Sequence, residues 1–270
     1  MNNSQKYCRT LHAPISLGTT SDDRFMPSGY LEAFAQMDSL VLTEKLDGQN
    51  NCFNKYGVFA RSHASISLHP WDKPLRERWQ LLKHDLGNLE IFGENMYGIH
   101  SIAYSQLESY FYVFAIREND RWLSWEEVKF YADFFDFPTV PEIPIAYPLN
   151  AFFQDHQHLS EDQILEQWLT INLGISWQEA VKTSGLLGGY SPANNQPCCE
   201  GFVIRNSKGF LTNQGIIKTA KNEFNNLFKL VRKSHVKTGV HWMKTWKPAK
   251  LIDYSKYCWY SYQFMENKST

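Results

Sequence analysis

The sequence has 270 residues, of which 43% are hydrophobic and 20% are charged, and its formal net charge is −1. This composition is ordinary for a folded globular protein and excludes a chain that is mostly disordered. No apolar run of about 18 residues and no N-terminal signal segment are present, so we expect a cytoplasmic protein without a membrane partner.

Strand patterns dominate the first half of the chain, and one pair of strands flanks a short turn at residues 54–57, as in a hairpin. A further strand is predicted late in the sequence. The predicted strands cover residues 39–44, 50–53, 58–61, 89–93, 111–116 and 200–205.

Three helices are predicted from capping patterns. In such a pattern the serine hydroxyl accepts a hydrogen bond from a backbone N–H of the first turn, and the side chain of a Glu or Gln three residues later accepts one from the serine's own backbone N–H. They begin at Ser124, Ser160 and Ser176. Prolines between residues 138 and 148 predict an extended connection between the first two helices.

Strands, hairpins and helices without a regular strand–helix–strand rhythm favour an α+β domain with largely antiparallel sheets. Neither a Gly-x-x-x-x-Gly-Lys-Ser/Thr loop nor a Gly-x-Gly-x-x-Gly loop is present. The sequence therefore gives no sign of a nucleotide held by a glycine-rich loop at a helix N-terminus.

The five cysteines are odd in number and contain no Cys-x-x-Cys pair. We therefore predict neither a disulfide framework nor a structural zinc site, and we interpret the cysteines as reduced and mostly buried. The histidines, His63 among them, match no known metal-site spacing, which favours solvated or hydrogen-bonded side chains. The cysteines are Cys8, Cys52, Cys198, Cys199 and Cys258.

Basic residues are concentrated between residues 205 and 250, which hold eleven lysines and arginines against a single acid, Glu223. Histidines and tryptophans lie among them. Such a stretch suits a polyanion, because lysine and arginine neutralise phosphates and flat rings stack on bases, although a solvated basic face has the same composition.

The segment from Glu44 to Asn50 reads Glu-Lys-Leu-Asp-Gly-Gln-Asn and places Lys45 at the end of an apolar strand. A lysine amine is a nucleophile only when neutral, so a catalytic lysine needs a site that disfavours its ammonium form. The alternative interpretation is a surface turn with a solvated lysine.

Five blocks in order make the chain resemble the covalent lysine nucleotidyltransferases, a family that includes ATP-dependent DNA and RNA ligases and mRNA capping enzymes. Additional stretches between residues 19 and 243 make it most similar to RNA ligases of the RNA ligase 2 type. The five blocks are residues 44–48, 59–62, 92–95, 111–116 and 200–205.

The resemblance implies that Lys45 attacks the α-phosphate of ATP and carries AMP as a covalent lysyl adduct. It places Leu46 beside the nucleophile in the nucleotide site and assigns adenosine contacts to Glu44 and Asn50. Asp47 stands where RNA ligases of the RNA ligase 2 type have a histidine, but it agrees with the wider family.

By the same resemblance Arg61 contacts the ribose or a phosphate, Glu94 contacts the ribose, and Phe114 stacks on adenine. Glu200 is implied to hold Mg²⁺, or Mn²⁺, through its hydration shell. These residue types suit the chemistry, since cations hold phosphates, carboxylates hold a divalent metal and an aromatic face accepts a base. Taken alone, Phe114 also fits a plain core position.

The family's last block, a Lys-x-Lys strand that grips the phosphates, has no direct counterpart in this sequence. Lys229 matches the related bacterial proteins through its flanking residues and is the favoured candidate. Lys218 and Lys221 follow a suitable apolar lead-in and are the alternatives.

The resemblance implies an α+β, ATP-grasp-like ligase adenylation domain over residues 1–247, with two antiparallel sheets flanking a nucleotide cleft, peripheral helices and a short tail over residues 248–270. That leaves no room for the oligonucleotide-binding barrel of DNA ligases, which favours an RNA ligase acting on nicked duplexes or broken RNA ends. The other hypotheses are a minimal DNA ligase, a guanylyltransferase, and a nucleic-acid-binding protein with a vestigial nucleotide site.

Overall fold

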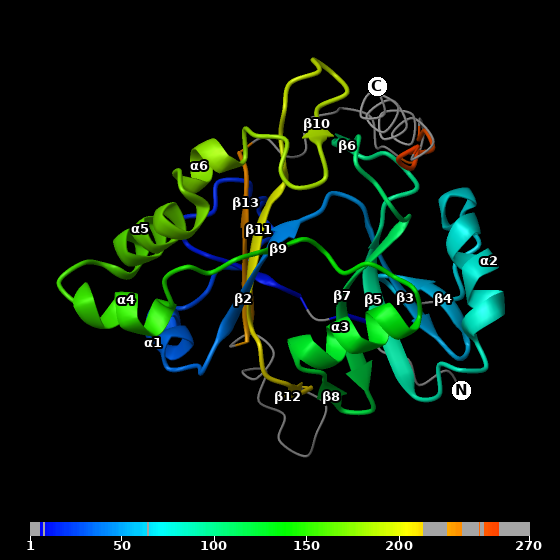
Figure 1. Ribbon diagram of the computed structural model, residues 1–270, viewed down its shortest axis with the longest axis horizontal. Helices are drawn as coiled ribbons and strands as arrows, with labels where there is room; N and C mark the ends of the chain where they lie inside the picture. The colour runs from blue at the N-terminus through cyan, green and yellow to red at the C-terminus, as the bar shows by residue number, and fades with distance from the viewer. Residues whose placement is uncertain are drawn as a thin grey trace, which may run out of the picture.

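A computed structural model describes residues 6–7, 9–63, 65–212, 226–233, 243 and 246–253. Over these ranges two large sheets stand side by side with helices on their outer faces (Figure 1). Strand pairing is antiparallel in both sheets except between the first and last strands of the chain. The predicted α+β class with largely antiparallel sheets is therefore confirmed.

The first sheet has the strand order β1-β13-β11-β2-β9. Because side chains alternate along a strand, Thr43 and Lys45 face one side of β2, while Leu42 and Glu44 face the other. The antiparallel register sets Gly201 opposite Lys45, so the nucleophile candidate and the start of β11 lie together. The strands are β1 (Leu11–His12), β13 (Leu227–Val231), β11 (Gly201–Asn206), β2 (Leu40–Lys45) and β9 (Glu142–Ile143).

Four helices cover the outer face of this sheet (Figure 1). Their apolar residues, among them Phe34 and Trp168, pack with Leu42, Phe202 and Phe228 from the strands in one buried cluster. This burial fixes which side chains of β2 face the helices and which face the second sheet. A shift of one residue in the strand pairing would turn the apolar side chains of β2 away from the helices. The helices are α1 (Tyr30–Ala35), α4 (Leu149–Asp155), α5 (Glu161–Leu173) and α6 (Trp177–Ala180).

The second sheet has the strand order β12-β8-β7-β5-β3-β4 and is antiparallel throughout. Phe53, Ile91 and Ile116 form the core on its outer side with residues of α2 (Lys73–Leu82) and α3 (Trp125–Phe134). Its strands are β12 (Phe210–Leu211), β8 (Arg121–Trp122), β7 (Phe111–Glu118), β5 (Leu89–Asn95), β3 (Gln49–Asn54) and β4 (Gly57–Ala60).

The predicted helix starts are confirmed, and two of them carry the full capping box. Ser124 and Glu127 exchange the expected hydrogen bonds at α3, and Ser160 and Gln163 do so at α5. Ser176 caps α6, which is a single turn. The helices α1, α2 and α4 and the 3₁₀ turn η1 (Pro70–Asp72) were not predicted.

The proline-rich segment from 138 to 148 is an extended connection, as predicted, and its strand β9 pairs with β2. A small two-stranded sheet joins β6 (Ala103–Tyr104) to β10 (Gly189–Tyr190). Near the end of the described chain, Pro248 bridges to Gly98 and Ala249 is buried in the core of the second sheet. The division into residues 1–247 and 248–270 stays a prediction.

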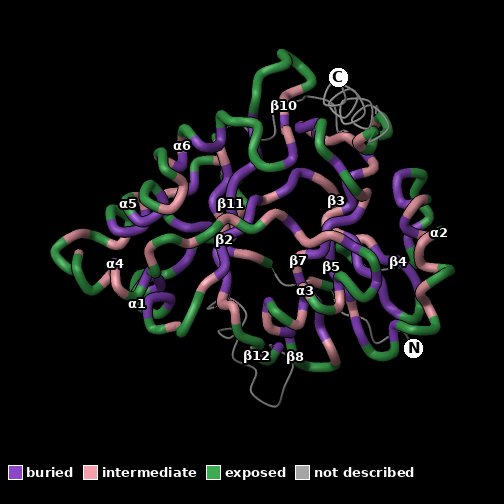
Figure 2. The backbone as a smooth tube through the Cα atoms, viewed as in Figure 1, coloured by how far each residue is buried: buried purple, intermediate pink, exposed green. Residues whose placement is uncertain are grey.

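Buried residues follow the strands of both sheets, and exposed residues lie on the outer turns of the helices (Figure 2). Among the residues described, no helix combines the length and apolar character needed to cross a membrane.

Candidate active site

The inner faces of the two sheets enclose a cavity of about 480 Å³. Strands β2, β11 and β13 contribute one wall, and β3, β5 and β7 contribute the other. The structure brings together here eight residues that the sequence predicted for the nucleotide site. They are Glu44, Lys45, Leu46, Asn50, Arg61, Glu94, Phe114 and Lys229.

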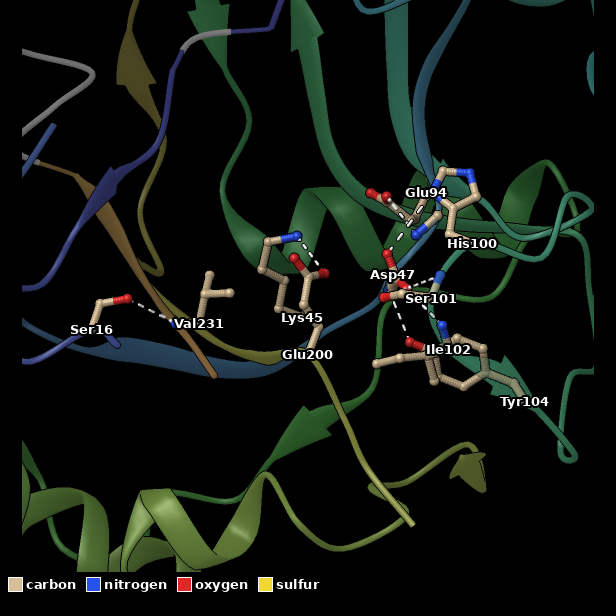
Figure 3. A network of polar contacts seen from close by, with 11 residues as sticks. Ser16, Lys45, Asp47, Glu94, His100, Ser101, Ile102, Tyr104, Glu200 and Val231 are labelled. Atoms are coloured by element: carbon tan, nitrogen blue, oxygen red, sulfur yellow. Dashed lines mark hydrogen bonds and ion pairs between the residues drawn. The ribbon is translucent and has the colours of Figure 1, made fainter. Parts of the chain in front are cut away.

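Lys45 ends β2 and forms an ion pair with Glu200, with 2.7 Å between Nζ and Oε2 (Figure 3). Burial lowers the pKa of the Lys45 ammonium group, but the negative charges of Glu200, Glu94 and Asp47 outweigh burial and leave the pKa raised. In the state described, Lys45 is therefore a paired ammonium ion. An ammonium ion is not a nucleophile, so any reaction at this amine would require another cation to neutralise these charges.

Glu94 lies across the cavity on β5, where it accepts a hydrogen bond from the Gly48 amide at 3.1 Å. The pKa of Glu94 is raised to about 7. Burial is the largest cause, the positive charge of Lys45 lowers the pKa, and the negative charges of Glu200 and Asp47 raise it. Several carboxyl groups thus converge around one amine, a donor set of hard oxygens that suits a divalent cation such as Mg²⁺.

Lys229 brings a second amine into the cavity from β13. Burial, and after it the neighbouring charge of Lys45, lower the pKa of Lys229 to about 8. Two cations held close together in this way form a site for an anion, because a bound phosphate would relieve the repulsion between them. The alternative candidates Lys218 and Lys221 lie outside the described residues.

Asp47, the acidic residue of the Lys-x-Asp-Gly motif, anchors the backbone rather than lining the cavity. Its Oδ2 accepts from the Ser101 amide at 2.9 Å, the Ser101 hydroxyl at 2.7 Å and the Ile102 amide at 2.8 Å. Its own amide donates to the Tyr104 hydroxyl at 2.8 Å (Figure 3). The Asp47 carboxylate therefore holds the loop after β5 against the turn that follows Lys45.

Gly48 is the last residue of that motif, and the backbone of Asn95 approaches it too closely for a side chain to fit. A Cβ atom here would lie 2.5 Å from the carbonyl oxygen of Asn95. A larger residue would push β3 away from β5 at the point where the cavity begins.

Glu44 lines the cavity, but its carboxylate does not point toward Lys45. Oε2 accepts from the Leu186 amide at 2.6 Å, beyond the opposite face of β2, and burial raises its pKa to about 7. An adenosine contact, as predicted for Glu44, would therefore have to come from its backbone.

Tyr7 and Thr10 also line the cavity, and sequence reasoning missed both. The Tyr7 ring stands edge-on to Phe114 with 5.0 Å between ring centroids and also contacts Phe92 and Trp122. No local motif marks this segment. It reaches the cavity because β1 pairs in parallel with β13, a contact between opposite ends of the chain.

Arg205, the first residue of the basic stretch, does not lie on an exposed face. It is buried between the sheets, where its guanidinium donates to the Phe114 carbonyl at 2.8 Å and the Leu123 carbonyl at 3.3 Å and covers the Trp125 ring. Its hydrogen bond holds the backbone of Phe114, and the residue also lines the cavity. By contrast Lys208 is exposed.

Two largely antiparallel sheets around a cavity, with a lysine at a strand end and carboxylates beside it, define a ligase-type nucleotidyltransferase domain. The chain belongs to the RNA ligase family, whose model matches residues 38–231. The predicted resemblance to that family is thereby confirmed. Among curated proteins, no sequence matches this chain.

Solved structures similar to this chain include an archaeal ATP-dependent RNA ligase, at 14% identity and a TM-score of 0.45, covering 85% of this chain and 48% of that one. A putative ATP-dependent DNA ligase from Aquifex aeolicus has 16% identity and a TM-score of 0.41, covering 84% and 50%. A Naegleria gruberi RNA ligase variant with ATP and Mn has 15% identity and a TM-score of 0.42, covering 76% and 52%. The chain thus spans about half the length of these proteins.

Proposed function

We propose that this chain is an ATP-dependent RNA ligase that joins 5′-phosphate and 3′-hydroxyl ends through a lysyl-AMP on Lys45. The observation that carries the proposal is the placement of the Lys45 amine in an inter-sheet cavity, 2.7 Å from Glu200 and flanked by Glu94 and Lys229. Membership of the RNA ligase family supports it. We assign the activity to the domain predicted over residues 1–247.

In the first step the neutral Lys45 amine attacks the α-phosphorus of ATP. The N–P bond forms, an N–H bond of the amine breaks and its proton goes to solvent, the bond from the α-phosphorus to the pyrophosphate oxygen breaks, and pyrophosphate leaves. Lys229 and Arg61 are the cavity cations that can hold the phosphates and stabilise the charge that develops on them. Phe114, with Tyr7 at its edge, offers the aromatic face for adenine.

Glu200 and Glu94 are the residues that would hold a divalent cation, Mg²⁺ or Mn²⁺. The raised pKa of Glu94, caused by burial and by the neighbouring charge of Glu200, fits such an ion, because two buried carboxylates are costly without a cation. When bound, the ion supplies charge neutralisation for the phosphates and weakens the hold of the carboxylates on the Lys45 proton.

In the next steps the AMP passes from Lys45 to a 5′-phosphate, and the 3′-hydroxyl attacks that activated phosphate with release of AMP. The same cavity serves both transfers of AMP. The basic residues after Arg205 that are exposed, Lys208 among them, can contribute to the path of the strand outside it.

The test uses four nicked duplexes that differ only in the sugar on each side of the break, assayed with ATP and magnesium at low and moderate salt. We expect sealing when the 3′-hydroxyl strand ends in ribonucleotides, and much slower sealing when it ends in deoxynucleotides, because only RNA offers 2′-hydroxyls and A-form geometry. Rates should fall with salt as neutralised phosphates regain counterions.

Equal rates on all four duplexes would favour the DNA ligase alternative. Labelling of the protein by GTP instead of ATP would favour a guanylyltransferase. No labelling by either nucleotide would identify a nucleic-acid-binding protein with a vestigial site.

A further inference from the structure

Three side chains with metal-ligating atoms meet on the inner face of the second sheet, in the same strands that form the cavity wall. Cys52 lies on β3, Glu90 lies on β5, and His63 lies in the turn that follows β4. One ligand atom from each lies within 4.8 Å of the other two. Within the described chain, this is the one set of three histidine, cysteine or acidic side chains that meets this criterion.

His63 is oriented as a metal-bound imidazole would be. Its ring stacks on Phe59 with 5.4 Å between centroids and 4° between planes. Nδ1 lies 3.4 Å from the Arg61 carbonyl oxygen, so the nitrogen left for a ligand is Nε2. That atom is buried and has no hydrogen-bond partner among the described residues. Histidines that bind a metal through one ring nitrogen commonly donate the N–H of the other to a backbone carbonyl.

Cys52 and Glu90 supply the negative charge that a cation needs. Cys52 is fully buried, and burial raises the pKa of its thiol, so that the sulfur stays protonated without a metal. Glu90 is fixed by Arg117, whose Nη2 lies 2.6 Å and whose Nε lies 2.8 Å from the same carboxylate oxygen, Oε2.

We propose that Cys52, His63 and Glu90 bind a divalent transition metal of the zinc class. One thiolate, one imidazole and one carboxylate form a borderline-soft set that suits Zn²⁺ and Co²⁺ and disfavours Mg²⁺, which prefers oxygen ligands. On binding, the metal–sulfur bond forms, the S–H bond breaks, and the proton goes to solvent. Three protein ligands leave a fourth position for water.

Such a metal would tie the turn after β4 to the neighbouring strands. Arg61, which lines the nucleotide cavity, is two residues from His63 in that turn. By holding this turn in place, the metal would position the Arg61 side chain for contact with bound phosphates without itself lying in the cavity. This role is separate from the magnesium expected at Glu94 and Glu200.

The experiment titrates the metal-free full chain with Co²⁺ in excess Mg²⁺, without ATP or RNA, and records the absorption spectrum. We expect one Co²⁺ to bind with a thiolate-to-cobalt charge-transfer band, and we expect Zn²⁺ to displace it. Cys52→Ser should abolish the band. Cys199→Ser is the matched control, because Cys199 is equally buried but lies in the core of the first sheet, and it should leave the band unchanged.

His63→Asn is a second variant, which tests the site even if the Cys52→Ser protein does not fold. His63 has a φ of 52°, a backbone conformation that asparagine tolerates, so His63→Asn should fold. It should bind Zn²⁺ at least about 100-fold more weakly, since outer partners alone change metal affinity by 10- to 100-fold. His69→Asn, at an exposed ring stacked on Trp71, should bind as the parent does. A parent without the charge-transfer band, or unchanged Zn²⁺ affinity in His63→Asn, would overturn the proposal.

Discussion

Lys45 and Glu200 form an ion pair, with 2.7 Å between Nζ and Oε2, at adjoining ends of β2 and β11. The negative charges around Lys45, first among them Glu200, raise the pKa of its ammonium group. In the proposed reaction, cations and ATP entering the cavity would have to break this pair before the Lys45 amine could react.

Incubation of the chain with ATP and magnesium should increase the protein mass by one AMP, because the Lys45 amine should form a phosphoramide. Lys45→Ala should lose the adduct completely, as measured by intact-mass spectrometry. Lys55→Ala, at an exposed lysine on the β3–β4 turn, is the control and should be labelled like the parent. An AMP adduct on the Lys45→Ala protein would remove Lys45 from the nucleophile's role.

Lys229→Ala should slow formation of the AMP adduct by about 100-fold, the usual effect of losing one charge that stabilises a transition state. Its amine lies in the cavity with Lys45, where burial lowers its pKa to about 8. Adduct formation should be timed for Lys218→Ala and Lys221→Ala in parallel. A larger loss in either of these would transfer the phosphate-binding role away from Lys229.

Glu200→Ala and Glu94→Ala should each fold but lose most ligation, by about 100-fold or more, since these carboxylates position reactants and contribute little to the core. Removal of divalent metal with a chelator should have the same effect on the parent. Joining rates should be compared with Glu179→Ala, at an exposed acid on α6. Undiminished joining by either variant would exclude its carboxylate from the reaction.

Asp47→Ala should destabilise the fold by about 2 to 3 kcal/mol, because the half-buried amide of Ser101 and the buried amide of Ile102 would lose their acceptor. Urea unfolding measures the change, and Asp85→Ala, at an exposed acid, provides the baseline. A value near that of Asp85→Ala would mean that the Asp47 network is not structural.

Glu44→Gln should change the pH dependence of stability. Burial raises the pKa of Glu44 from 4.5 to about 7, so between these values the native state keeps a proton that the unfolded chain has released. The unfolding free energy of the parent therefore falls as pH rises through this window. Glutamine does not ionise, so the variant should gain up to about 3 kcal/mol relative to the parent across the window.

Urea unfolding of both proteins at about pH 5 and about pH 8 measures this difference. The same stability difference at both pH values would show that Glu44 titrates normally.

The sequence by itself determined the strands that carry the site, since alternating apolar residues and turn residues predict strands from local information. It also located Lys45, whose position at a strand end follows from the same pattern. Capping residues such as Ser124 and Ser160 marked helix starts, because the bonds they make span only three residues.

Only the tertiary structure decided what depends on contacts between distant segments. The parallel pairing of β1 with β13 brings Tyr7 to Phe114, and no local pattern encodes that meeting. Strand pairing also placed Glu200 beside Lys45 and directed the carboxylate of Glu44 away from Lys45. It buried Arg205, which the charge pattern alone had grouped with the other basic residues of the stretch. Side-chain direction and burial are fixed by which strands pair and in which register, and the physical reason is that these pairings are made between residues far apart in the chain.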